Sequence, residues 1–266
     1  MGNVVLANAA LSDAAVITAG SQLASLPVTN LQTDQPSEVW RTDGLDNAWV
    51  EADFGAATQI NLASMLYTNL TSAATIQLRA AATQAALTAG PAYDSTAITA
   101  WLETSLGDWP FIHSYIWLGA APQSYRWWRI DLVDAANPDG YIQAGRLIVD
   151  DGLQAARNLQ NGWSVTYVDP SPHHRATNGA LWATPRDGAR LISYAHGFLT
   201  EDEMYDKFFD VDRTRGTKKS VLVIRDPDAL KHGHKQMVYG LVNRVRPIRS
   251  LGHVNYAKKI EIEEML

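Results

Sequence analysis

Short runs in which apolar and polar residues alternate fill the first half of the chain. In SYRWWRIDL, residues 124–132, the alternation favours a strand, because a helix needs apolar positions three or four residues apart. One face of this strand would carry Arg126, Trp128, Ile130 and Leu132, and the other face Tyr125, Trp127, Arg129 and Asp131. We therefore expect Trp128 to lie in a core and Trp127 to lie on a half-exposed surface.

Eight runs of this kind, separated by turn residues, predict the strands of an antiparallel sandwich. They cover residues 4–11, 15–20, 49–55, 60–69, 74–82, 114–119, 126–132 and 145–151. Gly55 is expected to end the third strand at a turn. Residues 83–113 are less clear, and a helical turn and a long loop both fit them.

The second half of the chain predicts further strands and a single clear helix. The strands are expected at 162–169, 187–198, 218–226, 237–248 and 256–266, and the helix at 199–216. Strands before and after one helix indicate an α+β unit, or a β-barrel with one helix across it. The predicted fold class is therefore mainly β.

The predicted helix carries start and stop signals. Thr200 and Glu203 have the spacing of a capping box, and Gly216 follows the last turn. Apolar residues recur along one face, with two aromatic residues beside them, so this face is expected to be buried. The stripe consists of Met204, Phe208 and Val211, flanked by Tyr205 and Phe209.

Charge is distributed unevenly between the two halves. Residues 1–150 contain five Arg, no Lys and 14 Asp or Glu, for a net charge of −9, whereas residues 151–266 have a net charge of +3. This break predicts two domains, 1–154 and 155–266. The acidic first half argues against nucleic acid as its partner, since phosphates bind Lys and Arg.

Several classes of protein can be set aside on composition. The chain has no Cys, so it forms no disulfide and has no thiol nucleophile. No run approaches the roughly 18 apolar residues of a membrane helix. The N-terminal stretch lacks a basic region, so no signal peptide is predicted.

The first half resembles the discoidin-like, galactose-binding-like jelly rolls. LPVTNLQTDQPSEVWRT (26–42) precedes NAWVEADFGAATQINLASML (47–66), and YRWWRIDL precedes GYIQAGRLIVDD (140–151). In that family an early loop with a Trp leads into a "W-V/I-x-x-D-F/L-G" strand, and a late "Y-x-R-I" strand precedes a closing strand. The resemblance implies an N-terminal β-sandwich over most of residues 1–152.

The same resemblance implies a site in loops at one end of the sandwich, where family members often bind carbohydrate or lipid. The candidate ligand-binding residues are Trp40, Arg41, Asp43, Trp109, Tyr115 and Tyr141. An aromatic face beside Asp and Arg suits a sugar. The favoured alternative is that these aromatics pack the ends of the sandwich or a subunit interface. Tyr125, Trp127 and Arg129 are likewise expected at an interface with another domain or subunit.

The second half resembles the distal tail and baseplate proteins of tailed bacteriophages. The motifs that carry the resemblance lie, in order, at 190–198, 199–203, 221–227, 239–242 and 260–264. Such proteins commonly join a ring-forming β-rich domain to a galactose-binding-like one, although here the jelly roll comes first. The resemblance implies a homo-oligomeric ring with the tail tube, tape measure, hub and receptor-binding proteins as further partners.

Known catalytic motifs are absent from the sequence. There is no HExxH, G-x-S-x-G, Walker A or G-x-G-x-x-G pattern, and adjacent carboxylates in a strand point to opposite faces. His173, His174, His232 and His234 are expected to be solvated loop residues, so neither a metal site nor a cofactor is predicted. Catalysis by a hydrolase would need acids or histidines that converge in the fold.

A basic tract follows in the last fifty residues. It comprises KHGHK (231–235) with Arg244, Arg246, Arg249, Lys258 and Lys259. Because few aromatic residues are interleaved, an acidic protein partner explains this tract better than a nucleic acid.

These observations favour a structural, non-enzymatic virion protein of a bacteriophage tail tip, assembled in the host cytoplasm. The alternative is a carbohydrate-binding module that contacts host surface glycans.

Overall fold

The computed structural model describes residues 2–103, 111–119, 121–229, 231–252 and 254–266. The chain divides into two compact units: Met1–Gln154 with Leu222–Met237, and Ala155–Val221 with Val238–Leu266. Residues 222–237, which belong to the predicted second domain, are part of the first unit in the structure. The division falls within two strands, β18 (Ser220–Ile224) and β19 (Met237–Val242).

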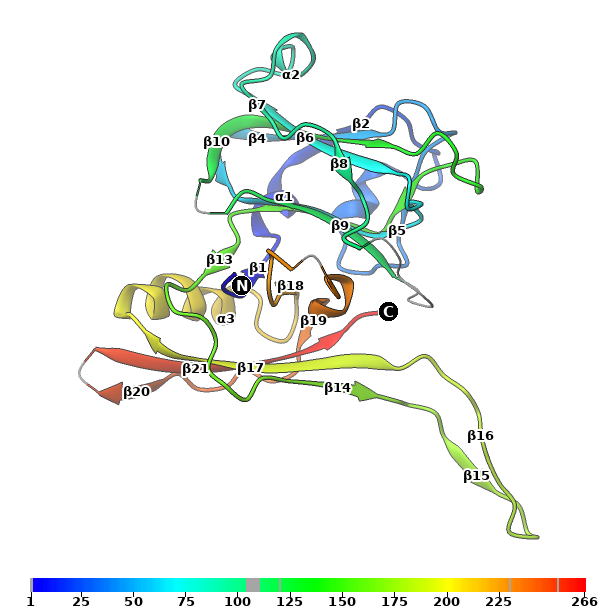
Figure 1. The fold of residues 1–266 in the computed structure, drawn as a ribbon, viewed down its shortest axis with the longest axis vertical. Helices are drawn as coiled ribbons and strands as arrows, with labels where there is room; N and C mark the ends of the chain where they lie inside the picture. The colour runs from blue at the N-terminus through cyan, green and yellow to red at the C-terminus, as the bar shows by residue number, and fades with distance from the viewer. Residues whose placement is uncertain (1, 104–110, 120, 230, 253) are drawn as a thin grey trace. The chain divides into compact units, whose positions relative to one another are not determined.

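Two antiparallel sheets form a sandwich in the first unit (Figure 1). One sheet has the strand order β2–β4–β10–β6–β7 with β8 also paired to β6, and the other has the order β12–β5–β9. Side chains of both sheets fill the core between them, including Val50, Leu78 and Ile130 of the first and Met65 and Leu147 of the second. The fold class is therefore mainly β, as predicted, with a jelly-roll sandwich first.

The bounds of the sandwich strands are β2 Val16–Ala19, β4 Trp49–Ile60, β5 Leu62–Thr68, β6 Thr75–Ala81, β7 Tyr93–Asp94, β8 Ile98–Thr99, β9 Ile112–Trp117, β10 Gln123–Val133 and β12 Arg146–Asp150. The shorter elements of this unit are β1 Val5–Ala7, α1 Ala10–Ala14, η1 Val28–Gln32, β3 Trp40–Arg41, α2 Ala86–Ala89, β11 Gln143–Ala144, β13 Leu153–Gln154 and η3 His234–Gln236. In this unit β1 pairs with β13 on one side and with Leu222–Ile224 of β18 on the other.

The first predicted strand, residues 4–11, is wrong in its second half. The strand ends at Ala7, and the helix α1 begins at Ala10. Ala9 has a left-handed backbone (φ 56°), and the Asn8 side chain accepts a hydrogen bond from the Ala10 N–H at 2.9 Å. These local contacts turn the chain before the alternating pattern ends.

The alternation along β10 is also interrupted, which corrects the predicted faces. The register against β4 shifts between Tyr125 and Trp127, so that residues 54–57 of β4 lie opposite one residue of β10. Gly55, with φ 75°, lies inside β4 at this bulge and does not end the strand. As a result Tyr125 packs against the core, and Arg126 is exposed.

The second unit is built on a sheet with the order β19–β21–β17–β14, in which β20 also pairs with β21. The strands are β14 Ser164–Val168, β17 Ala189–Leu199, β20 Arg249–Gly252 and β21 Asn255–Glu264. A hairpin of β15 (His173–Arg175) and β16 (Leu181–Ala183) projects from the end of β14 and β17 (Figure 1). Buried Arg190 and Glu264 form an ion pair across this sheet.

The predicted helix is present, but its first part is wider than an α-helix. A π-helix over Glu203–Phe209 leads into α3 (Asp210–Thr214). The capping box is confirmed: the Thr200 N–H donates to the Glu203 carboxylate at 3.0 Å, and the Glu203 N–H donates to Thr200 Oγ1 at 3.2 Å. Gly216, the predicted stop signal, follows the end of the helix and has a left-handed backbone (φ 52°). Within the described ranges, no helix is long and apolar enough to span a membrane.

Candidate functional site

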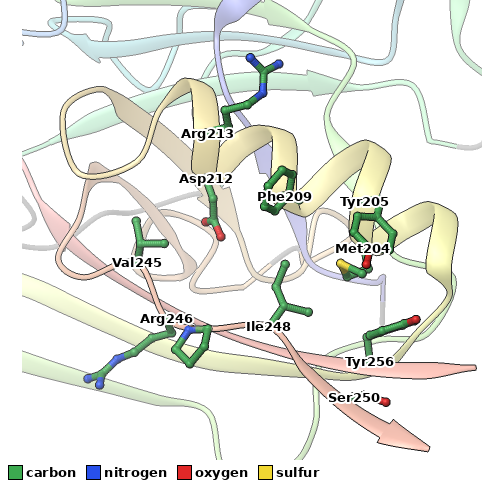
Figure 2. Close-up of a pocket in the computed structure, with 11 residues that line it drawn as sticks. Met204, Tyr205, Phe209, Asp212, Arg213, Val245, Arg246, Ile248, Ser250 and Tyr256 are labelled. Carbon is green, nitrogen blue, oxygen red and sulfur yellow. The ribbon is translucent and has the colours of Figure 1, made fainter. Parts of the chain in front are cut away.

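An apolar groove lies between this helix and the segment 245–250 in the second unit (Figure 2). Its volume is about 840 Å³. The side chains that give it its apolar character are Tyr205, Phe209, Val245, Pro247, Ile248 and Tyr256. Cavities of this size and lining are typical of binding sites.

A row of aromatic rings forms one wall of the groove. The ring centroids of Tyr205 and Phe209 are 6.3 Å apart, and those of Tyr205 and Tyr256 are also 6.3 Å apart, both in edge-on geometry. Tyr205 is 51% exposed and Phe209 is 47% exposed, so much of their ring surface faces solvent. Met204, Phe208 and Val211 are buried as predicted, which turns this aromatic flank outward.

Ion pairs below the groove hold its two walls together. The Lys258 ammonium contacts Asp212 on the helix and donates to the Arg246 carbonyl at 2.7 Å. The Arg246 guanidinium in turn pairs with Glu261 at 2.7 Å. Hydrogen bonds from Lys259 and Arg246 lower the pKa of Glu261. The expectation that Lys258 faces a partner is wrong, because this side chain is buried.

Sequence analysis missed the second wall of the groove. The predicted strand 237–248 ends at Val242, and residues 243–248 are not strand. Pro247 is the available signal, since Pro cannot donate to a ladder. Val245, which is exposed, and Ile248 therefore leave the sheet and face the helix.

Exposed apolar side chains gather in the second unit beyond the groove as well. Among the described residues, 13 of the 16 large hydrophobic side chains that are exposed belong to this unit. Leu181 is 61% exposed and Trp182 is 52% exposed on the hairpin. Strand β14 is exposed along its whole length and pairs with β17 on one edge. Surfaces of this kind mark interaction sites.

Of the predicted ligand-binding residues, Arg41 and Tyr141 come together in the first unit. The Arg41 guanidinium lies 4.0 Å from the centre of the Tyr141 ring and donates to Gln143 Oε1 at 2.7 Å. Next to them, Asn69 donates to Asp139 at 2.9 Å and to the Tyr141 carbonyl at 2.9 Å. This cluster combines an aromatic ring with hydrogen-bonding groups.

The other predicted ligand-binding residues lie apart from that arrangement. Trp40 is fully buried and its indole N–H donates to the Ser21 carbonyl at 3.1 Å, so it presents no ring face to a ligand. Tyr115 is also buried, and its hydroxyl donates to the Pro227 carbonyl at 2.9 Å. Burial raises the pKa of Tyr115 to about 12. Asp43 is exposed, and Trp109 lies outside the described residues.

The three predicted interface residues have different environments. Trp127 is half-buried on the outer face of its sheet, and Arg126 lies over its ring at 5.5 Å. Arg129 is paired within the unit, with Glu51 at 3.0 Å and Asp131 at 2.8 Å. Tyr125 packs against the core, so the three side chains do not form one surface patch.

The histidines are not all solvated loop residues, which corrects the prediction. His173 and His174 belong to β15, and the His174 ring stacks on Trp182 with centroids 5.7 Å apart. His234 is buried and its Nε2 accepts the Leu102 N–H at 3.3 Å. In the part of the chain that the structure describes, no group of three or more His, Asp or Glu could hold a metal ion.

Solved structures with a similar fold include carbohydrate-binding modules. The lectin domain of lectinolysin complexed with Lewis B antigen is 13% identical, with a TM-score of 0.38 over 54% of this chain and 96% of that one. A Streptococcus pneumoniae fucose binding module is 10% identical, with a TM-score of 0.38 over 54% and 94%. CBM32-1 from a Clostridium perfringens family 31 glycoside hydrolase is 11% identical, with a TM-score of 0.38 over 52% and 94%.

No protein-family model and no curated protein matches the sequence.

Proposed function

We propose that the chain is a structural assembly protein whose second unit binds other protein chains. The observation that carries this proposal is the concentration of exposed apolar side chains there, 13 of the 16 among the described residues. Eight of the 13 belong to the groove, the projecting hairpin or the edge strand β14. Exposure of such surfaces to water is unfavourable, and an open edge strand promotes uncontrolled pairing with other chains. Binding of a specific protein chain would bury the apolar side chains and cover the edge strand.

The setting we propose is the tail tip of a tailed bacteriophage, with the protein residing in the virion. The support comes from the order of motifs between residues 190 and 264, which resembles distal tail and baseplate proteins. The partners would be further copies of the chain and the neighbouring tail proteins. Such a role is carried out by interfaces, and we propose no enzymatic activity.

Light scattering over a concentration series, followed by negative-stain imaging, tests this function. We expect a mass that rises with concentration to a fixed multiple of 29.2 kDa, and closed rings in the images. A monomer at every concentration would contradict self-assembly.

A second candidate function is glycan binding by the first unit. The observation in its favour is the Arg41–Tyr141 pair beside Asn69 and Asp139, which offers a ring face together with donors and acceptors. The jelly-roll resemblance of residues 26–66 supports the same candidate.

A glycan array with matched variants tests this second function. Tyr141→Ala is expected to abolish any signal, because it removes the stacking face. Arg126→Ala is the control, since Arg126 also lies over an aromatic ring but at a different place in the unit. Signal that survives Tyr141→Ala, or no signal from the natural chain, would count against a glycan site in this cluster.

A further inference from the structure

We propose that the groove of the second unit receives the β15–β16 hairpin of a second copy of this chain. The inference rests on the proposed assembly function and names the two surfaces that meet. Both surfaces are exposed, both are apolar and both belong to the same unit. Three features favour their pairing: their positions on the sheet, the charges of the hairpin tip and the helix, and a Trp182 side chain that is held in place before binding.

The hairpin and the helix beside the groove adjoin opposite ends of the same strand, β17. The hairpin segment joins β17 at Ala189, and the helix that forms the groove follows Leu199. An extended strand of 11 residues separates its ends by about 33–36 Å. Figure 1 shows the hairpin pointing away from α3 and β20. The hairpin of one copy is therefore directed outward, where the groove of another copy can receive it.

The tip of the hairpin and the exposed side of the helix beside the groove carry opposite charges. The β15–β16 hairpin, residues 173–183, carries Arg175 and two histidines but no Asp or Glu, and Asp169 and Asp187 balance Arg175 and Arg186 over the whole segment 169–188. Along the helix beside the groove, four acidic side chains are exposed: Glu201, Asp202, Asp206 and Asp210. Arg175 on the hairpin can pair with these carboxylates on the helix, whereas Arg213 and Arg246, which line the groove, leave the apolar contacts to the Trp182 side chain.

The apolar anchor of the hairpin is held in position before binding. Strand pairing of His173 with Ala183 and of Arg175 with Leu181 fixes the two arms, and the His174 ring stacks on Trp182 at 5.7 Å. A Trp side chain that is already ordered loses little entropy on binding. Trp is also one of the residue types, with Tyr and Arg, that are enriched at the energetic centre of interfaces. Trp182 is thus the side chain we place against Tyr205 and Phe209.

A contact between two different surfaces of identical chains is head-to-tail. Each copy then offers one hairpin and one groove, so copies add in sequence and form a ring if the rotation closes or a filament if it does not. This geometry makes a prediction that a symmetric dimer does not share. A variant with a defective hairpin and a variant with a defective groove should still bind each other through their two intact surfaces. The product should be a dimer that cannot grow further.

Two variants of the full chain test the pairing. Trp182→Ser removes the anchor and Phe209→Glu places a charge in the groove; both residues are about half exposed, so the fold should be kept. Val133→Ser, which removes an exposed apolar side chain from the first unit, is the control. Circular dichroism checks the fold, and analytical ultracentrifugation measures association. We expect each variant to weaken self-association at least tenfold, the control to match the natural chain, and an equimolar mixture of the two variants to form a dimer.

The outcomes separate this inference from the function on which it rests. If the natural chain assembles and the two variants assemble equally well, the hairpin–groove contact is wrong while the assembly function stands. If both variants are monomers and their mixture is also monomeric, the two surfaces do not bind each other. If the natural chain is a monomer at every concentration, the self-assembly function fails and the inference fails with it.

Discussion

Trp127 and Trp128 are neighbours in the chain but lie in different environments. Trp128 is almost completely buried, and its indole N–H donates to the Tyr125 carbonyl at 3.0 Å. Trp127 is half-buried beneath Arg126.

Trp128→Ala should lower the free energy of unfolding by about 3–5 kcal/mol, because it leaves a large cavity. Trp127→Ala should lower it by about 1 kcal/mol or less. Urea denaturation measures both, and equal losses would contradict the assignment.

The burial of Trp128 follows from alternation, which is visible in the sequence because a strand has a period of two. The exposure of Arg126 does not follow from it. That exposure depends on four residues of β4 that bulge opposite it, and their position is set by pairing between segments about 70 residues apart. Trp40 illustrates the same limit: an aromatic residue in a predicted loop is equally compatible with a ligand site and with the core, and the structure places it in the core.

His196 should make the stability of the second unit depend on pH. It is buried beside Tyr194 and Phe208, and burial lowers its pKa to about 4. In the unfolded chain the pKa is about 6.5, so the unfolded state binds the proton first as the pH falls. Stability from neutral His196 is complete above about pH 6.5 and is lost progressively towards pH 4, by roughly 3 kcal/mol.

Urea denaturation of the natural chain and of His196→Gln at pH 7, 5.5 and 4 checks this dependence. Gln retains a hydrogen-bond donor and does not titrate, so the variant should lose less stability over that range. The same pH dependence in both chains would show that another group is responsible.

Among the elements, the helix start offers the most direct test. Thr200 and Glu203 exchange hydrogen bonds, and Glu203 also accepts the Ala156 N–H at 2.7 Å. Thr200→Ala should therefore lower the free energy of unfolding by about 1 kcal/mol. Thr177→Ala, at an exposed position of the hairpin segment, is the matched control and should change it little. Equal stability of the two variants in urea would contradict a stabilising role for the cap.

The ends of the helix could be predicted because caps are local: Thr200, Glu203 and Gly216 lie within one short segment. The π-helical part could not, since no spacing in the sequence sets it apart from an α-helix. The groove could be predicted only in part. The helical spacing places Tyr205 and Phe209 beside the buried stripe, but Val245 and Ile248 come from a segment about 40 residues away whose pattern predicts a strand.

At the scale of the whole molecule, the first unit is discontinuous in sequence. It needs residues 222–237, because Leu222, Val223 and Ile224 are buried against β1 and the Pro227 carbonyl accepts the Tyr115 hydroxyl. A chain of residues 1–154 alone should be less stable than the first unit within the full protein by several kcal/mol, since each lost apolar side chain contributes about 1.5–3 kcal/mol. Thermal unfolding compares the stability of the two chains, and hydrogen exchange compares the protection of the β1 amides. Equal protection of β1 in both chains would contradict the predicted loss of stability.

The charge break near residue 155 is visible in the sequence, but the return of the chain to the first unit is not. The apolar run 218–226 correctly predicts a strand, but the apolar pattern does not determine which other strand pairs with it. Its pairing with β1 joins segments more than 200 residues apart, which local patterns do not encode.

The discontinuity also sets the order of events during translation. Residue 237 leaves the ribosome 83 positions after residue 154, which at about 5–20 residues per second takes roughly 4–17 s. Strand β21, which pairs with β17, β19 and β20 in the second unit, spans Asn255–Glu264 and emerges later still. Neither unit is complete when its first strands appear, so the nascent chain holds apolar strands without partners for seconds. The yield of folded protein in cells should therefore depend strongly on the supply of chaperones and on the speed of synthesis, and not only on the stability of the folded protein.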